Sequence, residues 1–463
     1  MGKQTIHFNI SERKLLLRFV DVFVVLLSLY LVSNWFHFDY FTITKENWTW
    51  VGVLILYISI FGTVFELYHL QKASRTDKVF ANIILTASVT VLFYLLTPFF
   101  TPLLPSNRLQ ILYFYVAIIV ALTLWRLFYI YFISAPRFYK KVLIVGETSN
   151  IETVVNAFRY VDPNYKIVGY INCEKALENA IVIDGITEYP PSAIHDIIEK
   201  ESISEIVVAS YNAETITSEI YHDLISLLER GFPIKEYTQV YEDITYRVPV
   251  QFVGKDFYKY FPFSRSNKNK LYLFFHRFFD VTLALIGSVA GLALTPLVFL
   301  GNLVGNKGPL LYRQERVGKN GKLFSIIKFR TMVTNAETNG AVWAIKNDSR
   351  ITPFGMFLRR SRLDEVPQFF NILKGDMSLI GPRPERPFFV KELSAVIPFY
   401  ETRHIVKPGL TGWAQVNVRY GGTVDDSLLK LQYDLYYIKH RSFFLDLNVM
   451  VKTIGTMVYF RGQ

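Results

Sequence analysis

The residues best suited to chemistry are two adjacent carboxylates, Asp364 and Glu365. They follow a basic stretch that contains Arg359, Arg360 and Arg362, and they precede an apolar run with helical spacing. Nearby guanidinium groups favour the charged form of a carboxylate. We therefore expect an ionised acid pair beside an anion-binding pocket.

A local motif gives the pair a second interpretation. Ser361 and Asp364 fit the Ser/Thr-x-x-Asp/Glu pattern of a capping box, which would place Asp364 in the first turn of a helix, at the positive end of its dipole. Capping boxes and surface ion pairs are far commoner than catalytic sites. Taken alone, the pair favours a helix cap, and only the surrounding chain reverses that interpretation.

Cations and rigid turns elsewhere in the last third could complete a reactive site. Lys328 and Arg330 follow a predicted strand, and Arg359 directly precedes the acids. Arg383 stands between two prolines in a Gly-Pro-Arg-Pro turn, which limits the entropy lost when its side chain binds an anion. Residues 407–413 form another rigid turn. Clustered cations with paired acids are what a diphosphate and its metal ion require.

The composition is that of a membrane protein with basic surfaces. The 463 residues are 51% hydrophobic and 16% aromatic, yet the formal net charge is +11. No nucleic-acid-binding motif accompanies this charge, so we expect no nucleic-acid partner and favour anionic lipid and phosphorylated substrates. Cys173 is the only cysteine, which excludes an intrachain disulfide and fits a reducing cytosol.

The first third contains four apolar segments of about the length that a helix needs to cross a bilayer. They cover residues 15–36, 49–70, 79–100 and 110–133. Lysines and arginines concentrate before the first segment, between the second and third, and after the fourth, which predicts that both ends of this bundle face the cytoplasm. No small-residue cleavage site follows the first segment, so we interpret it as a retained span and not a signal peptide.

Residues 139–250 alternate β-rich and helical runs. Strands are predicted at 142–145, 166–170 and 205–209, and helices near 151–160, 191–200 and 215–231. This alternation predicts a parallel, doubly wound sheet. The first turn, beginning at Gly146, lacks the later glycines with which a dinucleotide-binding loop approaches a pyrophosphate, so a structural or regulatory module is favoured over nucleotide binding.

A fifth apolar stretch, Phe279 to Val304, opens the last part of the chain and contains Thr295 and Pro296. A straight span would separate the acid pair from cytosolic nucleotides, and both flanks are basic. We favour a re-entrant hairpin over about 271–304, broken at Pro296, with the Thr295 hydroxyl satisfying a freed carbonyl. A kinked spanning helix remains the alternative.

An apolar stripe at helical spacing lies near the end of the chain, between Phe443 and Ile454, with basic residues beside it. It could be ordinary core or a helix lying in the membrane interface, and the sequence does not decide between the two.

Sequence blocks in the last two fifths of the chain resemble the bacterial polyprenyl-phosphate hexose-1-phosphate transferases, the monotopic-core phosphoglycosyl transferases that start exopolysaccharide or O-antigen assembly. The matching blocks are Gly308-Pro309, Arg313–Gly318, Lys328–Met332, Leu363-Asp364-Glu365, Asn371, Leu373–Ser378, Gly381–Pro384 and Lys407–Val416. Thr295-Pro296 stands where this family has a helix-breaking Ser-Pro. The four spans followed by a degenerate Rossmann-like module also look like the long-form members.

The resemblance implies a fold and a location. The fold is a membrane protein with a four-helix transmembrane bundle (1–138), a Rossmann-like α/β module (139–250) and a mixed α/β catalytic core with the re-entrant hairpin (251–463). The location is the bacterial inner membrane, with the core on its cytoplasmic face, and a homodimer is plausible.

The resemblance also implies a covalent mechanism with a UDP-hexose as donor and undecaprenyl phosphate as acceptor. Asp364 would attack the sugar-bearing phosphorus and release UMP, and the acceptor would then take the sugar phosphate from the aspartyl intermediate. Glu365 would hold Mg²⁺. Lys328, Arg359 and Arg383 match positions around the phosphates, and Arg330 belongs to the same basic block.

Two other functions remain open. A glycosyltransferase would release UDP instead of UMP, and a non-catalytic membrane scaffold or regulator of polysaccharide export would use the acids only as a cap. The sequence does not identify the sugar: glucose and galactose follow from family analogy, and N-acetylated sugars are not excluded.

Overall fold

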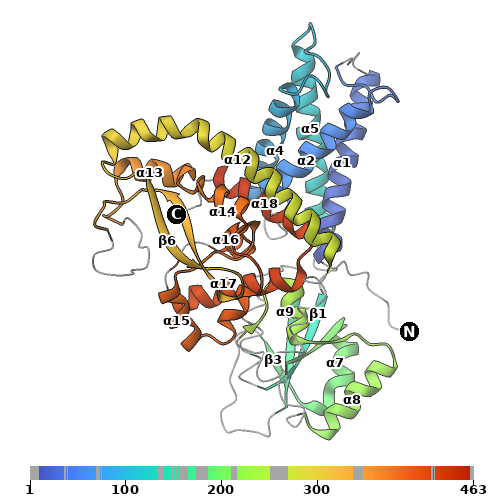
Figure 1. Cartoon of the computed structure of the whole chain (residues 1–463). Helices are drawn as coiled ribbons and strands as arrows, with labels where there is room; N and C mark the ends of the chain where they lie inside the picture. Colours follow the sequence, from blue (N-terminus) through green and yellow to red (C-terminus); the bar gives the residue numbers. More distant parts are fainter. Residues whose placement is uncertain are drawn as a thin grey trace. The chain divides into compact units, whose positions relative to one another are not determined.

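The computed structural model in Figure 1 describes residues 10–35, 38, 40–68, 73, 76–133, 140–147, 151, 155, 165–173, 186–209, 216–250, 269–336, 348–418, 421 and 423–458. The chain forms two compact units, Met1–Thr245 and Tyr246–Gln463. Val248 and Val250 pack in the core of the second unit. The predicted connector at 246–270 falls mostly outside the described residues.

Four apolar helices open the first unit, and they lie side by side in Figure 1. They are α1 (Ile10–Trp35), α2 (Trp48–Val64), α4 (Thr76–Leu95) and α5 (Leu109–Phe128), and a short π-helical turn extends α5 to Ile133. All four contribute to one core, in which Val25, Leu54, Ala87 and Phe114 are buried. Apolar helices near the N-terminus are therefore present, and their arrangement as a transmembrane bundle stays a prediction.

Two of these helices are shorter than the sequence predicts. By length and composition α1 and α5 can cross a membrane, whereas α2 and α4 are apolar but short. The chain leaves helical geometry after α2 at Glu66, whose φ is +57°, and α4 ends three residues before Pro98, which disfavours helix in the residue that precedes it. Membrane crossing by α2 and α4 stays a prediction.

The second part of this unit is a five-stranded parallel sheet in the order β3-β2-β1-β4-β5. Its strands are β1 (Lys140–Gly146), β2 (Tyr165–Asn172), β3 (Thr187–Tyr189), β4 (Glu205–Ala209) and β5 (Ile234–Glu236), and its described helices are α7 (Ile194–Glu201), α8 (Ser218–Glu229) and α9 (Tyr237–Thr245). The parallel sheet confirms the predicted α/β class. Most of the predicted helix at 151–160 and most of the first turn lie outside the described residues.

The second unit contains the acid pair. Its helices are α12 (Lys270–Gly305), α13 (Pro353–Arg360), α14 (Gln368–Lys374), α15 (Pro387–Val396), α16 (Trp413–Asn417), α17 (Val424–His440) and α18 (Phe443–Val458). Strands β6 (Leu311–Val317) and β7 (Leu323–Phe329) form an antiparallel hairpin, and β8 (Ser378–Ile380) pairs in parallel with β9 (Gly409–Thr411). Two 3-10 turns, η7 (Leu363–Glu365) and η8 (Tyr400–Ile405), join the helices.

Helix α12 carries the fifth apolar stretch and continues through Pro296. The predicted break at Pro296 does not divide the helix in two: α12 stays one helix and visibly changes direction in Figure 1, as a proline inside a helix commonly causes. Pro296 has no N–H, so the carbonyl of Leu292 lacks its usual helical donor. The Thr295 hydroxyl donates to the neighbouring carbonyl, that of Gly291, at 2.8 Å. The hairpin geometry itself stays a prediction.

One side of α12 docks on the core and the rest is apolar and exposed. Gly287 packs against Phe369 of α14, and Gly291 packs against Val366, which directly follows η7, because a Cβ at either position would overlap that side chain. Asp280, also in α12, accepts hydrogen bonds from the Ser378 hydroxyl at 3.0 Å and the Leu379 N–H at 2.8 Å. The acid-pair region is thus fixed directly to the apolar helix.

Candidate functional site

The acid pair lies in a 3-10 turn and not in the first turn of an α-helix. Helix α13 is capped by Thr352 and ends at Arg360, Arg362 adopts a left-handed conformation with φ +58°, and η7 follows. The predicted capping box is therefore wrong. The Ser361 hydroxyl instead donates back to the Phe357 and Leu358 carbonyls at 2.9 and 3.2 Å. Serine side chains commonly bond to backbone carbonyls of the preceding helical turn in this way.

Three cations from three different segments surround Glu365. The Nζ atom of Lys328, in β7, lies 3.2 Å from Oε1, and Nη1 of Arg383 lies 3.6 Å from the same oxygen. Nη1 of Arg362 lies 3.6 Å from Oε2. Two of these residues were predicted as phosphate ligands. Arg362 was not, although it belongs to the basic stretch before the acids and stands three residues before Glu365.

The two carboxyl groups have different electrostatic environments. The pKa of Asp364 is raised to about 6: burial is the largest cause and the charge of Glu365 adds to it, while Lys328, Arg359 and Arg362 act in the opposite direction. Burial also disfavours the charge of Glu365, but Lys328, Arg383 and Arg362 together hold the pKa of that carboxyl at about 2. The arginines lower the pKa of Asp364 as expected, but desolvation is the larger effect, so the net shift is upward.

The structure leaves one oxygen of this pair available. Asp364 is 8% exposed, and its buried Oδ1 atom meets no hydrogen-bond donor among the described residues. A carboxylate of raised pKa with an uncommitted oxygen is suited to nucleophilic attack, whereas Glu365 is a permanently charged partner.

A side chain from α14 braces the strand that carries Lys328. Asn371 accepts a hydrogen bond from the Ile327 N–H at 3.1 Å and donates one to the Ser325 carbonyl at 2.8 Å. These bonds fix β7 against the helix that follows the acids. Asn371 was noted in the sequence only as part of a matching block, and its role emerges from the fold.

Arg359 and Arg330 differ in their relation to the acids. The Nε atom of Arg359 donates to the Thr331 hydroxyl at 2.9 Å, and its charge lowers the pKa of Asp364. Arg330 is buried and donates to the Pro309 and Met332 carbonyls and to both oxygens of Asn306 at the end of α12. These bonds indicate that Arg330 holds the segment after α12 against neighbouring backbone, so Arg330 is not proposed as a phosphate ligand.

A Mg²⁺ ion would need both carboxylates and oxygen atoms from a substrate. The described residues contain no group of three acidic, histidine or cysteine side chains that could hold a metal alone. Adjacent carboxylates with one uncommitted buried oxygen suit a hard cation that takes one or two carboxylates plus phosphate oxygens. The residues therefore fit Mg²⁺ when a diphosphate is also present.

The apolar stripe near the chain end lies on α18 and is exposed. Phe443, Phe444, Leu447 and Ile454 face outward, and the ring of Phe443 lies 6.0 Å from that of Phe279 in α12. The opposite side of α18 packs through Val449 into the core. This pattern favours an interfacial helix over an ordinary core helix, which the sequence left open.

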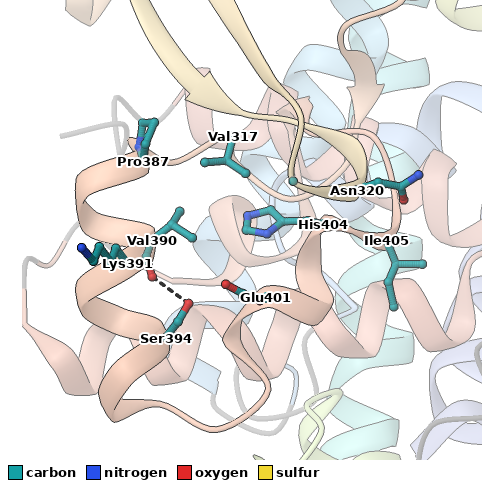
Figure 2. A pocket seen from close by; sticks show the side chains of 10 residues that line it. Val317, Asn320, Pro387, Val390, Lys391, Ser394, Glu401, His404 and Ile405 are labelled. Atoms are coloured by element: carbon teal, nitrogen blue, oxygen red, sulfur yellow. Dashed lines mark hydrogen bonds between the residues drawn. The ribbon is translucent and has the colours of Figure 1, made fainter.

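Figure 2 shows a pocket of about 470 Å³ elsewhere in the second unit. It lies between the β6–β7 turn and α15, with His404 at its centre and Lys391 and Glu401 on its walls. Burial and the neighbouring Arg403 lower the pKa of His404 to about 4, so its imidazole is neutral. None of the predicted site residues lines this pocket.

Comparison with known proteins identifies relatives of the second unit. Residues 271–460 match the family model described as bacterial sugar transferase. The UDP-N-acetylgalactosamine-undecaprenyl-phosphate N-acetylgalactosaminephosphotransferase of Aeromonas hydrophila is 38% identical over 258 residues, which are 55% of this chain and 59% of that protein. Several proteins named UDP-glucose:undecaprenyl-phosphate glucose-1-phosphate transferase also match, and two of them illustrate the coverage.

The UDP-glucose:undecaprenyl-phosphate glucose-1-phosphate transferase of Caulobacter vibrioides is 37% identical over 184 residues, which are 39% of this chain and 69% of that protein. The one from Xanthomonas campestris pv. campestris is 43% identical over 177 residues, 38% of this chain and 37% of its own length. The chain thus spans less than two thirds of the Aeromonas and Xanthomonas proteins.

Proposed function

The chain belongs to the bacterial sugar transferase family, and from this premise we propose that it transfers hexose 1-phosphate from a UDP-hexose to undecaprenyl phosphate. The observation that carries the proposal is the acid pair itself: the carboxyl of Asp364 is buried with one oxygen that meets no donor among the described residues, and the carboxyl of Glu365 beside it is held by three cations. Such a division suits one nucleophile and one permanently charged partner in the same site.

In the first half-reaction, an oxygen of ionised Asp364 attacks the phosphorus that bears the sugar. The bond from that phosphorus to the bridging oxygen breaks, and UMP leaves with the electron pair. Lys328, Arg362 and Arg383, which Glu365 holds together, stabilise the charge that develops on the phosphate oxygens. The product is an acyl phosphate between Asp364 and the sugar.

In the second half-reaction, a phosphate oxygen of undecaprenyl phosphate attacks the same phosphorus. The acyl phosphate bond breaks, Asp364 returns to its carboxylate, and a lipid diphosphate sugar forms. Asp364 and Glu365 would hold Mg²⁺ together with phosphate oxygens, and the ion would supply charge neutralisation at the diphosphate. This product would be the first lipid-linked sugar in the synthesis of a polysaccharide repeat unit.

A lipid acceptor accounts for the exposed apolar side chains of α12 and α18. Helix α12 is apolar enough to enter a membrane, and most of its apolar side chains face outward. Glycines at its contact with α14 place the acid turn close to it. We propose that α12 enters and leaves the membrane on the cytoplasmic face of the inner membrane, with α18 in the interface, so that the acids meet the lipid phosphate.

The experiment is to incubate the purified full chain with Mg²⁺, undecaprenyl phosphate and single UDP-sugars. The panel contains UDP-glucose, UDP-galactose and their N-acetylated counterparts, because the names of the relatives include both glucose and N-acetylgalactosamine. We expect UMP and lipid-linked sugar in equal amounts with at least one donor. Release of UDP would instead indicate a glycosyltransferase, and absence of any product would favour a scaffold.

Two variants control this experiment. Asp364→Asn should abolish product formation, because an amide cannot form the acyl phosphate. Asp425→Asn removes an exposed carboxylate in the first turn of α17 and should leave the rate unchanged. The homodimer expected from the resemblance is kept as a proposal, and the mass of the detergent-solubilised protein tests it.

A further inference from the structure

The loop that carries Arg383 is held by its backbone from several sides. Each of the four consecutive carbonyls of residues 382–385 accepts a hydrogen bond from a different donor. In loop order the donors are the N–H of Gly409 at 2.8 Å, the guanidinium of Arg403 at 3.2 Å, the guanidinium of Arg316 at 3.0 Å and the N–H of Val317 at 3.0 Å. The loop is thus fixed by β9, η8 and β6 together.

Arg403 is the donor that requires explanation, because it is a buried cation. It is only 4% exposed, and its Nη2 atom lies 2.6 Å from Oδ2 of Asp434 in α17. Its Nη1 atom donates to the Tyr400 hydroxyl at 2.7 Å, and the guanidinium lies over the Tyr400 ring at 5.1 Å. A buried ion pair is weak support for stability, since apolar residues of similar volume often replace one without loss.

The geometry connects this pair to the acids through one residue. The carbonyl of Arg383 accepts the bond from Nη2 of Arg403, while the side chain of Arg383 reaches Oε1 of Glu365 at 3.6 Å. A planar guanidinium can hold Asp434, Tyr400 and a backbone carbonyl at once because its N–H groups point in fixed directions. The short ammonium head of lysine cannot reproduce that fork.

We infer that Arg403, anchored by Asp434, is a positioning residue that fixes the backbone of Arg383 so that its guanidinium meets the donor diphosphate beside Glu365. The inference rests on the proposed function and deepens it. Arg403 itself touches neither acid in the structure, so its effect must pass through Arg383. A purely structural role for Arg403 would instead lower stability without any dependence on Arg383.

A double-mutant cycle separates these two roles. Arg403→Lys keeps a cation beside Asp434 but loses the fork, and we expect kcat/KM for the UDP-sugar to fall about tenfold in the otherwise unaltered chain. In the Arg383→Ala background, whose own activity is already reduced, the same substitution should change kcat/KM less than twofold. The KM for undecaprenyl phosphate should stay unchanged in both. An equal tenfold loss in both backgrounds would overturn the inference.

A second variant distinguishes loss of positioning from loss of the fold. Arg403→Met combined with Asp434→Leu removes both charges together, which retains the core volume without leaving a charge unpaired. We expect its thermal unfolding to remain cooperative and kcat/KM for the donor still to fall about tenfold, because the Arg383 carbonyl has lost its donor. A folded double variant with normal kcat/KM would show that Arg403 does not position Arg383. If this variant unfolds, the Arg403→Lys cycle alone decides.

The outcomes separate this inference from the proposed function. If the unaltered chain releases no UMP with any donor, the proposed function fails and no kinetic coupling can exist. If the unaltered chain is active but the Arg403 and Arg383 substitutions act independently, the proposed function stands and the positioning role fails.

Discussion

The ammonium of Lys328 lies 3.2 Å from Oε1 of Glu365 and also acts electrostatically on Asp364. Burial raises the pKa of Asp364 to about 6 despite this cation, whereas Lys328, Arg383 and Arg362 overcome burial and hold the pKa of Glu365 at about 2. Only one carboxyl of the pair therefore titrates near neutral pH.

This division predicts the pH dependence of the first half-reaction. The nucleophile must be ionised, so the rate of UMP release in the absence of acceptor should be constant well above pH 6 and should fall about tenfold per pH unit below it. Glu365 stays charged across this range. Single-turnover measurements between pH 5 and 9 check this, and a rate independent of pH down to 5 would exclude Asp364 as the group that must ionise.

Removing the charge of Lys328 should move that pH profile. Because Lys328 lowers the pKa of both acids, Lys328→Met should shift the acid limb to higher pH, besides slowing the reaction by about a hundredfold through loss of phosphate stabilisation. Lys374→Met is the matched control, since its ammonium is exposed and pairs with Asp376 at 3.2 Å instead. A slow Lys328→Met protein with an unshifted profile would show that Lys328 acts only on the substrate.

The nucleophile should also reduce the stability of the fold. The pKa of Asp364 lies about two units above its ordinary value of 3.8, so its ionised form destabilises the folded state by roughly 3 kcal/mol above pH 6. Asp364→Asn should therefore raise the unfolding temperature by a few degrees at pH 8, and this gain should disappear below pH 4, where Asp364 is protonated in both states. Thermal unfolding in detergent measures it; a lower unfolding temperature for Asp364→Asn at pH 8 would contradict the assigned environment.

Much of this architecture could be predicted from periodicity. The apolar segments, the strands at 142–145, 166–170 and 205–209 and the importance of the basic and acidic blocks are local properties of the sequence. Helix ends were less predictable: Val64 and Leu95 end helices whose apolar run continues, the first close to Glu66 with its positive φ and the second three residues before Pro98.

The site geometry depended on contacts that no local pattern contains. Ser361 looked like a cap, yet it lies at the end of α13 and bonds backward to that helix. Arg362 contacts Glu365 from a residue with a positive φ, and Arg330 donates to Asn306 just after α12 instead of binding at the acid pair. The pKa of Asp364 follows from burial, which charge counting along the sequence does not show.

The path of α12 through the membrane can be tested by labelling. Cys173 is first changed to serine, and single cysteines then replace Lys270 or Lys307, two exposed residues at either end of α12. If α12 enters and leaves on one face, a membrane-impermeant maleimide should label both positions in inverted vesicles and neither in intact cells with a permeabilised outer membrane. Labelling of the two positions from opposite faces would show a spanning helix.

The most direct test of the account is the mass of the peptide that contains Asp364 after brief incubation of the full chain with Mg²⁺ and an accepted UDP-sugar, without undecaprenyl phosphate. We predict that this peptide gains the mass of one hexose phosphate, less water, and that the gain disappears when the acceptor is added. If lipid-linked sugar accumulates under turnover while no such adduct forms on Asp364, the covalent mechanism is contradicted.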